Sequence, residues 1–273
     1  MFLQSVTPLL PLRPFIDSFW VFESDFGVPF TSSRVIVPNG KPKIIIPYLN
    51  GLLAQDRSGS QERKEGEIHF VGNWDQSVVI SSNTRKTGTI IIELTPAGAY
   101  RFAKIAMQEV SNQIIGFSDL YGTLGKNLQE QIGNIDYLSE KIRKIQQFLL
   151  SQLLVLNQHQ GIVDFVTNSI YKSQGRIEIK ELEQKTGYSK RYLSLLFNEY
   201  IGISPKTLAA IVRFQRFYHL WANAPSPSFY KDDLYQFYYD QSHFIKEFKR
   251  FTGYSPVRYA ETDNEFGRIF YKE

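Results

Sequence analysis

The sequence predicts an α+β protein of two domains, in which an antiparallel β sandwich or barrel precedes an all-helical domain. Three observations predict this fold class: β-branched runs fill the first half, apolar residues recur at helical spacing in the second half, and one capped motif occurs there twice. The chain has 273 residues, 42% of them hydrophobic, and is therefore long enough to bury two cores.

The expected strands lie between about residues 10 and 95. Turn-forming sequences separate them: Pro-Asn-Gly at 38–40, Asn-Gly at 50–51 and a polar loop at 55–67. Between these turns, β-branched residues are concentrated in four segments: RVIVP (34–38), KIIIPYL (43–49), SVVISS (77–82) and TGTIIIELTP (87–96). Short strands joined by such turns indicate a small antiparallel sandwich or barrel.

Helices are expected after the strands. One begins near Pro96 and has four apolar residues on one face: Ala99, Phe102, Ala103 and Ala106. Another, LSEKIRKIQQFLLSQLLVL (138–156), repeats apolar residues at three- and four-residue spacing. Its apolar stripe docks either on the sandwich or on a second copy of the chain, and docking within the chain is the commoner outcome.

The repeated motif lies in the helical half. SKRYLSLLFNEYIGISP (189–205) and DQSHFIKEFKRFTGYSP (240–256) share their apolar, glycine and Ser-Pro positions when one is shifted by 51 residues. In the first copy Gly187 ends a short helix and Ser189 caps the next one. The Gly-x-Ser-Pro that closes each copy stops one helix and starts another, with serine at the N-cap and proline at N1. This order of elements is the outline of a helix-turn-helix.

Two such units are suited to reading DNA, because the second helix of a helix-turn-helix can enter the major groove. The helix expected between them, Pro205 to about Ala222, spans roughly 25 Å. That length is compatible with two groove-entering helices about one DNA turn, roughly 34 Å, apart. The alternative is that the matched positions serve packing alone, as they do in helical bundles that bind nothing.

Basic residues are concentrated in the two copies. Between Lys172 and Arg258 there are 14 Lys and Arg against 8 Asp and Glu, so this segment carries the whole positive excess of the +4 chain. Such residues would neutralise phosphates and supply most of the affinity. The expected DNA-backbone contacts are Lys206, Lys249, Arg250 and Arg258. The expected base-reading residues are Lys190, Arg191, Ser194, Gln241, Ser242 and Lys246. Arg191 suits guanine and Gln241 suits adenine.

The tandem pattern resembles the DNA-binding domain of the AraC/XylS family of bacterial transcription regulators. The run DQSHF-x3-F-x4-G-x-SP matches the C-terminal signature of that family, and the resemblance covers about residues 160–260. In the first half, PLRPFIDSFWVF (11–22) and RVIVPNGKPKIII (34–46) are similar to the sensor domain of one branch. The resemblance implies a cupin-like sensor or dimerisation domain (1–125), a linker helix region (126–158), a tandem helix-turn-helix domain (159–265) and a tail (266–273).

Some residues depart from the family pattern. Leu195 stands where a base-contacting arginine is frequent, and Glu183 stands where alanine is usual. Phe237 replaces a glycine before the second signature, and the helix expected at 232–237 is about two residues short, with Tyr235 where a small residue is expected. Because phenylalanine adopts a positive φ only at a cost, the turn of the second unit is expected to have another geometry. Leu195 and Phe237 favour a rival function, a regulator that acts through protein contacts with a weakened DNA-reading surface.

An enzyme is the other rival, because cupin-like barrels can hold catalytic metals. The chain has no cysteine, and of its four histidines only His69 lies in the β half, so we expect no metal site, no cofactor and no enzymatic activity. The aromatic residues of the first half could line a ligand pocket, although aromatic residues in strands more often belong to a core. The candidates are Trp20, Phe22, Tyr48, Phe70 and Trp74.

The expected partners follow from the resemblance. They are double-stranded promoter DNA, a small-molecule effector, a second copy of the chain and, for an activator, RNA polymerase. No signal peptide or membrane-spanning segment is expected, and the absence of cysteine suits a cytoplasmic location. The identity of the effector and the direction of regulation are left open by the sequence.

Overall fold

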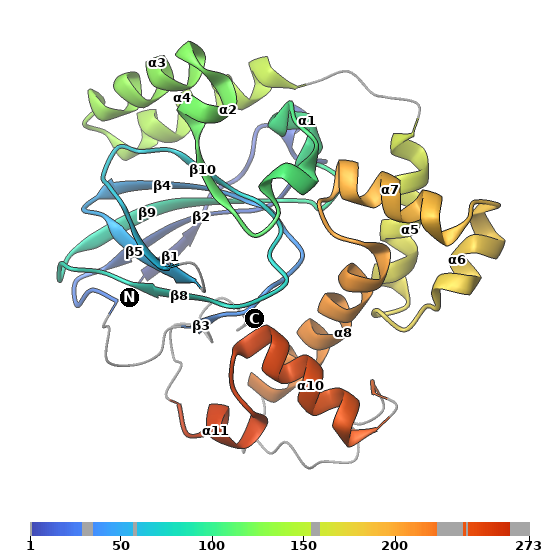
Figure 1. The fold of residues 1–273 in the computed structure, drawn as a ribbon. Helices are drawn as coiled ribbons and strands as arrows, with labels where there is room; N and C mark the ends of the chain where they lie inside the picture. Colours follow the sequence, from blue (N-terminus) through green and yellow to red (C-terminus); the bar gives the residue numbers. More distant parts are fainter. Residues whose placement is uncertain are drawn as a thin grey trace.

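The computed structural model describes residues 2–28, 35–56, 59–153, 159–222, 237–238 and 240–262. The described residues between 2 and 116 form a domain of two antiparallel sheets, the β domain, and those between 160 and 262 form the helical domain. The two lie side by side, and three helices cover the opposite side of the β domain (Figure 1). The predicted α+β fold class is confirmed.

The larger sheet is entirely antiparallel. In the residues that the structure describes, its strands follow the order β1 (Phe2–Ser5), β2 (Ile16–Ser24), β9 (Thr87–Leu94), β4 (Lys43–Leu49), β7 (His69–Val71) and β10 (Ile114–Gly116). The register pairs Trp20 of β2 with Ile91 of β9, and Ile91 with Ile45 of β4. These three side chains therefore lie in one row across the middle of the sheet.

The smaller sheet faces the larger one. Its strands follow the order β3 (Val35–Ile36), β8 (Val78–Ser81), β5 (Leu52–Asp56) and β6 (Gly59–Arg63). The four segments predicted as strands from their β-branched residues contain β3, β4, β8 and β9, as expected. β6 and the end of β5 fall instead in the predicted polar loop (55–67), and β1 and β10 lie outside the expected range of strands.

Side chains of β2 alternate between the two faces of the larger sheet, as strand geometry requires. Phe19 and Val21 belong to a core beneath the covering helices, whereas Phe22 packs against residues of the smaller sheet such as Leu52 and Ile80. The two faces of the sheet are therefore both apolar, and each has its own partner layer.

The covering helices are α2 (Phe117–Tyr121), α3 (Thr123–Gly133) and α4 (Leu138–Gln152). Ile145 and Leu149 of α4 are fully buried in the same core as Phe19. The backbone N–H of Leu9, next to the 3-10 helix η1 (Leu10–Leu12), donates to the side chain of Gln146 on α4 at 2.7 Å. The apolar stripe predicted for this segment thus docks within the chain.

The helix predicted to start near Pro96 is much shorter than expected. α1 (Tyr100–Ala103) makes a single turn, and Lys104 then adopts the left-handed conformation with φ 57°, which ends the helix. Phe102 and Ala103 are buried as predicted, but Ala106 lies outside α1 and precedes the 3-10 helix η2 (Met107–Val110). The expectation of one continuous face was therefore wrong.

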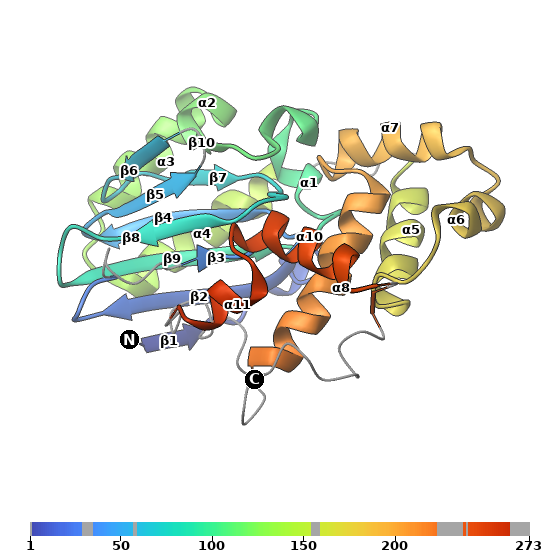
Figure 2. The same cartoon turned by 60° about the horizontal axis from the view of Figure 1, so that its bottom comes forward.

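The helical domain is built around one long helix. α8 (Pro205–Ala222) lies between α5 (Gln160–Lys172), α6 (Ile179–Thr186) and α7 (Lys190–Tyr200) on one side and α10 (Gln241–Thr252) and α11 (Pro256–Ala260) on the other (Figures 1 and 2). The helix predicted from Pro205 to about Ala222 is confirmed.

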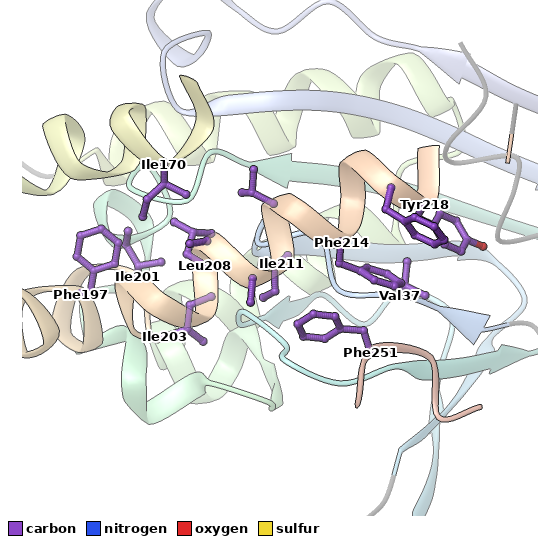
Figure 3. Close-up of a cluster of buried hydrophobic side chains, with 14 of the residues drawn as sticks. Val37, Ile170, Phe197, Ile201, Ile203, Leu208, Ile211, Phe214, Tyr218 and Phe251 are labelled. Atoms are coloured by element: carbon purple, nitrogen blue, oxygen red, sulfur yellow. The ribbon is translucent and has the colours of Figure 1, made fainter. Parts of the chain in front are cut away.

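A single core surrounds α8 and continues into the β domain. Leu208, Ile211 and Phe214 of α8 are fully buried against residues of α5, α7 and α10 (Figure 3). Val37, which follows strand β3, belongs to the same core. The helical domain is therefore docked on the β domain through buried apolar contacts.

A glycine permits a second close contact between the domains. Gly202, which follows α7, has φ 87°, and a Cβ atom at this position would lie 2.6 Å from the carbonyl oxygen of Met107 in η2. Nearby, the side-chain amide of Asn73 donates to the carbonyl oxygen of Ile201 at 2.9 Å, and this hydrogen bond is buried. The end of α7 is thus fixed to the β domain.

We expect Gly202→Ala to lower the free energy of unfolding by about 2–4 kcal/mol, because it adds the cost of a left-handed alanine to a clash with Met107. Gly187→Ala is the matched control. Gly187 has φ 73° with no atom near its missing Cβ, so only the conformational cost of about 1 kcal/mol is expected there. Urea denaturation measures both values, and equal losses would contradict the close interdomain contact.

Candidate nucleic-acid interface

The turn before α7 has the predicted caps. Gly187 ends α6 in the left-handed conformation, and the Ser189 hydroxyl accepts a hydrogen bond from the backbone N–H of Tyr192 at 3.3 Å. The carboxylate of Glu183 accepts from the backbone N–H of Lys190 at 2.6 Å. Glu183, a departure from the family pattern, therefore satisfies a free N–H of the first turn of α7 and holds α6 against it.

The second unit repeats this capping with another side chain. Asp240 accepts from the backbone N–H of His243 at 2.7 Å, and Gly253 ends α10 in the left-handed conformation with φ 82°. Ser204 and Ser255 cap α8 and α11 through backbone N–H groups three residues later, as the Gly-x-Ser-Pro pattern predicts. The acidic cap of α10 also complements the positive end of the helix dipole.

The apolar positions shared by the two copies are core positions. Leu193 and Phe197 of α7 are fully buried. Their counterparts in α10 are Phe244, which is 3% exposed, and Phe248, which is fully buried. Phe244 packs edge-on against Phe217 of α8, with ring centroids 4.7 Å apart. The common skeleton thus fixes both helices on α8 and leaves the exposed residues on their outer faces available for contacts.

The residues expected to read bases lie on the outer faces of these helices. Lys190 and Arg191 on α7 and Gln241, Ser242 and Lys246 on α10 are exposed. Ser194 is half-buried. Each helix therefore presents polar and basic side chains on the side opposite its core face.

The four residues expected to contact the DNA backbone differ in their surroundings. Lys206, Lys249 and Arg258 are exposed, and the Arg258 guanidinium lies over the ring of Tyr254 at 5.6 Å from its centroid. Arg250 instead forms an ion pair of 2.6 Å with Asp75 of the β domain. In this structure its guanidinium is bound to a carboxylate of the other domain.

A buried ion pair anchors α10, and sequence reasoning did not predict it. Arg213 of α8 contacts Glu247 of α10 at 2.6 Å, and both side chains are less than one-fifth exposed. Arg213 also donates to the carbonyl oxygen of Gly175, and its guanidinium lies 5.2 Å from the centre of the Tyr238 ring. The imidazole of His243 lies 3.3 Å from Glu247. Burial raises the pKa of the Tyr238 hydroxyl, and the negative charge of Glu247 raises it further, by a smaller amount.

The departure expected at Phe237 falls at the edge of the described chain. Residues 223–236 and 239, which include all of the expected short helix except Phe237, lie outside the described residues. The ring of Phe237 itself is half-buried and packs against the core around α8. An aromatic residue at this position therefore serves the core.

A cavity of about 620 Å³ lies between the two sheets and reaches the helical domain. Trp20, Phe22 and Trp74 line it. Tyr48 and Phe70 do not: Tyr48 donates to Glu23, and Phe70 points into the core on the other face of the larger sheet. The strand alternation separates His69 and Val71, which line the cavity, from Phe70 between them.

The end of this cavity at the domain boundary is charged. Glu93 is almost fully buried and accepts hydrogen bonds from Ser18 and Asn39, with Lys43 at 3.2 Å. Burial alone would raise the pKa of Glu93, but Lys43, Lys41 and these hydrogen bonds outweigh burial and leave the pKa below its ordinary value. The helical domain completes this end with five residues: Tyr171, Gln174, Val212, Gln215 and Arg216.

Several buried polar atoms along the cavity have no hydrogen-bond partner in the described part of the chain, and three of them matter here. These three are the indole nitrogen of Trp74 and the hydroxyl oxygens of Thr89 and Tyr171. Burial raises the pKa of Tyr171, so its hydroxyl stays protonated. Because a buried polar group without a partner costs free energy, these atoms favour a guest that can form hydrogen bonds with them.

The loop at residues 72–77 connects this cavity to both helix-turn-helix units. Trp74 and Gln76 line the cavity. Asn73 binds the carbonyl oxygen after α7, and Asp75 binds Arg250 on α10. The side chains of this loop thus alternate between the cavity and the helical domain.

The chain matches two family models. Residues 4–116 match a family described as "Domain of unknown function (DUF6597)", and residues 182–262 match a family described as "Helix-turn-helix domain". No curated protein matches the chain. Among the described residues, no helix is long and apolar enough to cross a membrane.

Several solved structures are distantly similar. A structure of ToxT from Vibrio cholerae is 14% identical, covers 89% of this chain and 98% of its own, and superposes with a TM-score of 0.48. A ToxT structure described as bound to an unsaturated fatty acid is 14% identical, covers 89% and 95%, and has a TM-score of 0.46. CuxR, described as an AraC-like transcriptional activator, is 12% identical, covers 81% and 86%, and has a TM-score of 0.27.

We expect Glu247→Ala to lower the free energy of unfolding by about 3 kcal/mol, because it leaves the Arg213 guanidinium buried without its counter-charge. The matched control is Glu181→Ala, which breaks the half-exposed ion pair with Lys185 on α6. That change is expected to cost no more than about 0.5 kcal/mol. Chemical denaturation followed by far-ultraviolet circular dichroism measures both, and similar values for the two variants would show that the buried pair does not anchor α10.

Proposed function

We propose that this chain is a DNA-binding transcription regulator whose helices α7 and α10 read two successive major grooves of promoter DNA. The observation that carries the proposal is the pair of capped helices on opposite ends of α8, each with an apolar core face and a polar, basic outer face. Two such helices joined by one rigid helix form a reader with a fixed spacing.

The length of α8 supports this spacing. Its 18 residues extend over about 27 Å at 1.5 Å per residue. α7 and α10 both pack on this helix, so their separation is set by buried contacts. A separation of about one DNA turn, roughly 34 Å, is within reach of two helices that extend outward from its ends.

The outer faces suggest how each helix contributes. Arg191 on α7 suits the acceptor pair of guanine, and Gln241 on α10 suits the donor and acceptor of adenine. Lys190, Ser194, Ser242 and Lys246 complete the proposed base-reading set. Lys206, Lys249 and Arg258 are exposed beside these helices and suit phosphate contacts.

The cavity supports control by a small molecule. Its lining is mostly apolar, with a charged end at the domain boundary and with hydrogen-bonding groups of Trp74, Thr89 and Tyr171 that lack partners in the described chain. This composition is typical of ligand sites, which combine an apolar body with a few polar groups. A guest here touches α5 and α8 directly, because residues of both helices form part of the wall.

The loop at residues 72–77 can transmit the presence of a guest in the cavity to the DNA-reading helices. A guest that moves Trp74 or Gln76 also moves Asp75, whose carboxylate holds Arg250. Phosphate and Asp75 compete for this guanidinium, so the ion pair weakens DNA binding while it lasts. Effector binding that breaks the pair therefore increases the affinity for DNA.

Selection of bound duplexes from a random pool tests the reading of two grooves. We expect two short motifs about one helical turn apart. Arg191→Ala is expected to cost about 1–3 kcal/mol and to relax the preference at one base position, because one bidentate base contact is lost.

Lys126→Ala is the control, since Lys126 is exposed on α3, which covers the far face of the β domain. A single recovered motif would mean that α10 does not read bases. Absence of any enriched sequence, together with little salt dependence of binding, would instead favour a regulator that acts through protein contacts.

Asp75→Ala tests the competition for Arg250. We expect tighter binding to a random duplex at low salt, and a plot of log K against log salt concentration that is steeper by about 0.9, because one more phosphate contact forms. Fluorescence anisotropy with a labelled duplex over a range of salt concentrations gives both values.

Asp25→Ala removes the same charge at an exposed site that faces Lys86 at 4.0 Å, and it serves as the control. If both variants shift the salt dependence equally, the effect is one of net charge and the proposed competition is wrong.

A further inference from the structure

Each proposed recognition helix exposes one aliphatic side chain among its polar residues. Leu195 on α7 is 59% exposed, and Ile245 on α10 is 37% exposed. The other aliphatic residues of α7, Leu193 and Leu196, are at most 4% exposed in the core. Leu195 and Ile245 are thus not part of the packing that holds the helices on α8.

Both residues lie on the face proposed to read bases. Leu195 follows Arg191 by four positions, and Ile245 follows Gln241 by four positions. Residues at this spacing are neighbours on one face of a helix, one turn apart. Each helix therefore presents the same pair, a hydrogen-bonding side chain and, one turn further, an aliphatic one. The pair is not a product of the 51-residue repeat, which aligns Ile245 with Ser194.

Among the four bases, only thymine presents a methyl group at its major-groove edge. An exposed aliphatic side chain on a groove-entering helix gains free energy when it removes that methyl from water. We infer that Leu195 and Ile245 are specificity-determining residues that contact thymine methyl groups, one in each half-site. This inference rests on the proposed reading of DNA by α7 and α10.

The geometry limits where each thymine lies. One helical turn is about 5.4 Å long, and successive base pairs are about 3.4 Å apart. Each thymine is therefore expected within one or two base pairs of the base read by Arg191 or Gln241. Leu195, at the position where arginine is frequent in the family, then changes which base is read and does not weaken the reading surface.

The charges around the two residues favour DNA over a protein partner. Arg191 and Lys190 lie one turn or more before Leu195, and Lys246 and Lys249 follow Ile245 within about one turn. All four are exposed. Lysine is depleted in protein interfaces, whereas it is common in surfaces that neutralise phosphates.

The test uses the full chain and the duplex obtained by selection. Each thymine is replaced in turn by deoxyuridine, which removes only the methyl group and keeps every hydrogen-bonding group. We expect one thymine in each half-site whose replacement weakens binding about fourfold, the equivalent of one buried methyl group. Anisotropy titrations at fixed salt concentration give the dissociation constants.

Variants assign the two positions. With Leu195→Ala, the replacement in the α7 half-site is expected to have no further effect, while the replacement in the α10 half-site keeps its fourfold effect. Ile245→Ala is expected to give the reverse pattern. Leu124→Ala, at a leucine 53% exposed on α3, is the control and is expected to leave both effects unchanged.

Several outcomes would overturn the inference. Sequence-specific binding that is indifferent to every deoxyuridine replacement would refute the methyl contacts and leave the proposed function intact. Loss of transcription control in Leu195→Ala with unchanged DNA affinity would assign this residue to a protein partner. Absence of any sequence-specific binding by the unaltered chain would refute the proposed function itself, and the methyl contacts with it.

Discussion

The burial of α8 on several sides determines the arrangement of the rest of the helical domain. Phe214 and Phe217 are fully buried on α8 and contact Phe248 and Phe244 of α10, while Leu208 lies in the same core as α5 and α7. Because protein interiors are close-packed, neither helix-turn-helix unit can shift on α8 without opening a void. Val37 extends this core into the β domain, so the position of the whole reader is also tied to the sandwich.

This constraint explains why the two copies agree where they do. The positions that match after a shift of 51 residues are those that face α8 or end a helix, such as Phe197 and Phe248, or Gly202 and Gly253. The outer faces, which contact neither α8 nor a cap, have diverged: Arg191 aligns with Ser242, and Leu195 with Lys246. Matching cores with different outer faces are what a protein needs when two copies of one scaffold read different half-sites.

Local signals in the sequence were sufficient for much of this structure. Caps such as Ser189 and Gly187, the β-branched strands and the length of α8 depend on neighbouring residues, and all were predicted. Contacts between distant segments were not: Asn73 and Ile201 are 128 positions apart, and Asp75 and Arg250 are 175 positions apart. The pair of Arg213 and Glu247 had a weak signal, a charge on the inner side of each helix. Among the pocket candidates, strand alternation separates Phe70 from Trp20, but no local pattern shows which face encloses a cavity.

The alternating loop at residues 72–77 has a consequence that follows from reciprocity. A coupling free energy between two sites is the same whichever site is occupied first. On the proposed mechanism, a phosphate that takes Arg250 from Asp75 also releases the loop from which Trp74 reaches the cavity. Binding to a promoter then changes the affinity of the cavity for the small molecule by the same factor as the small molecule changes the affinity for the promoter. The ligand affinity of the protein would thus differ between its free and promoter-bound populations, and the balance would depend on the number of operator copies in the cell.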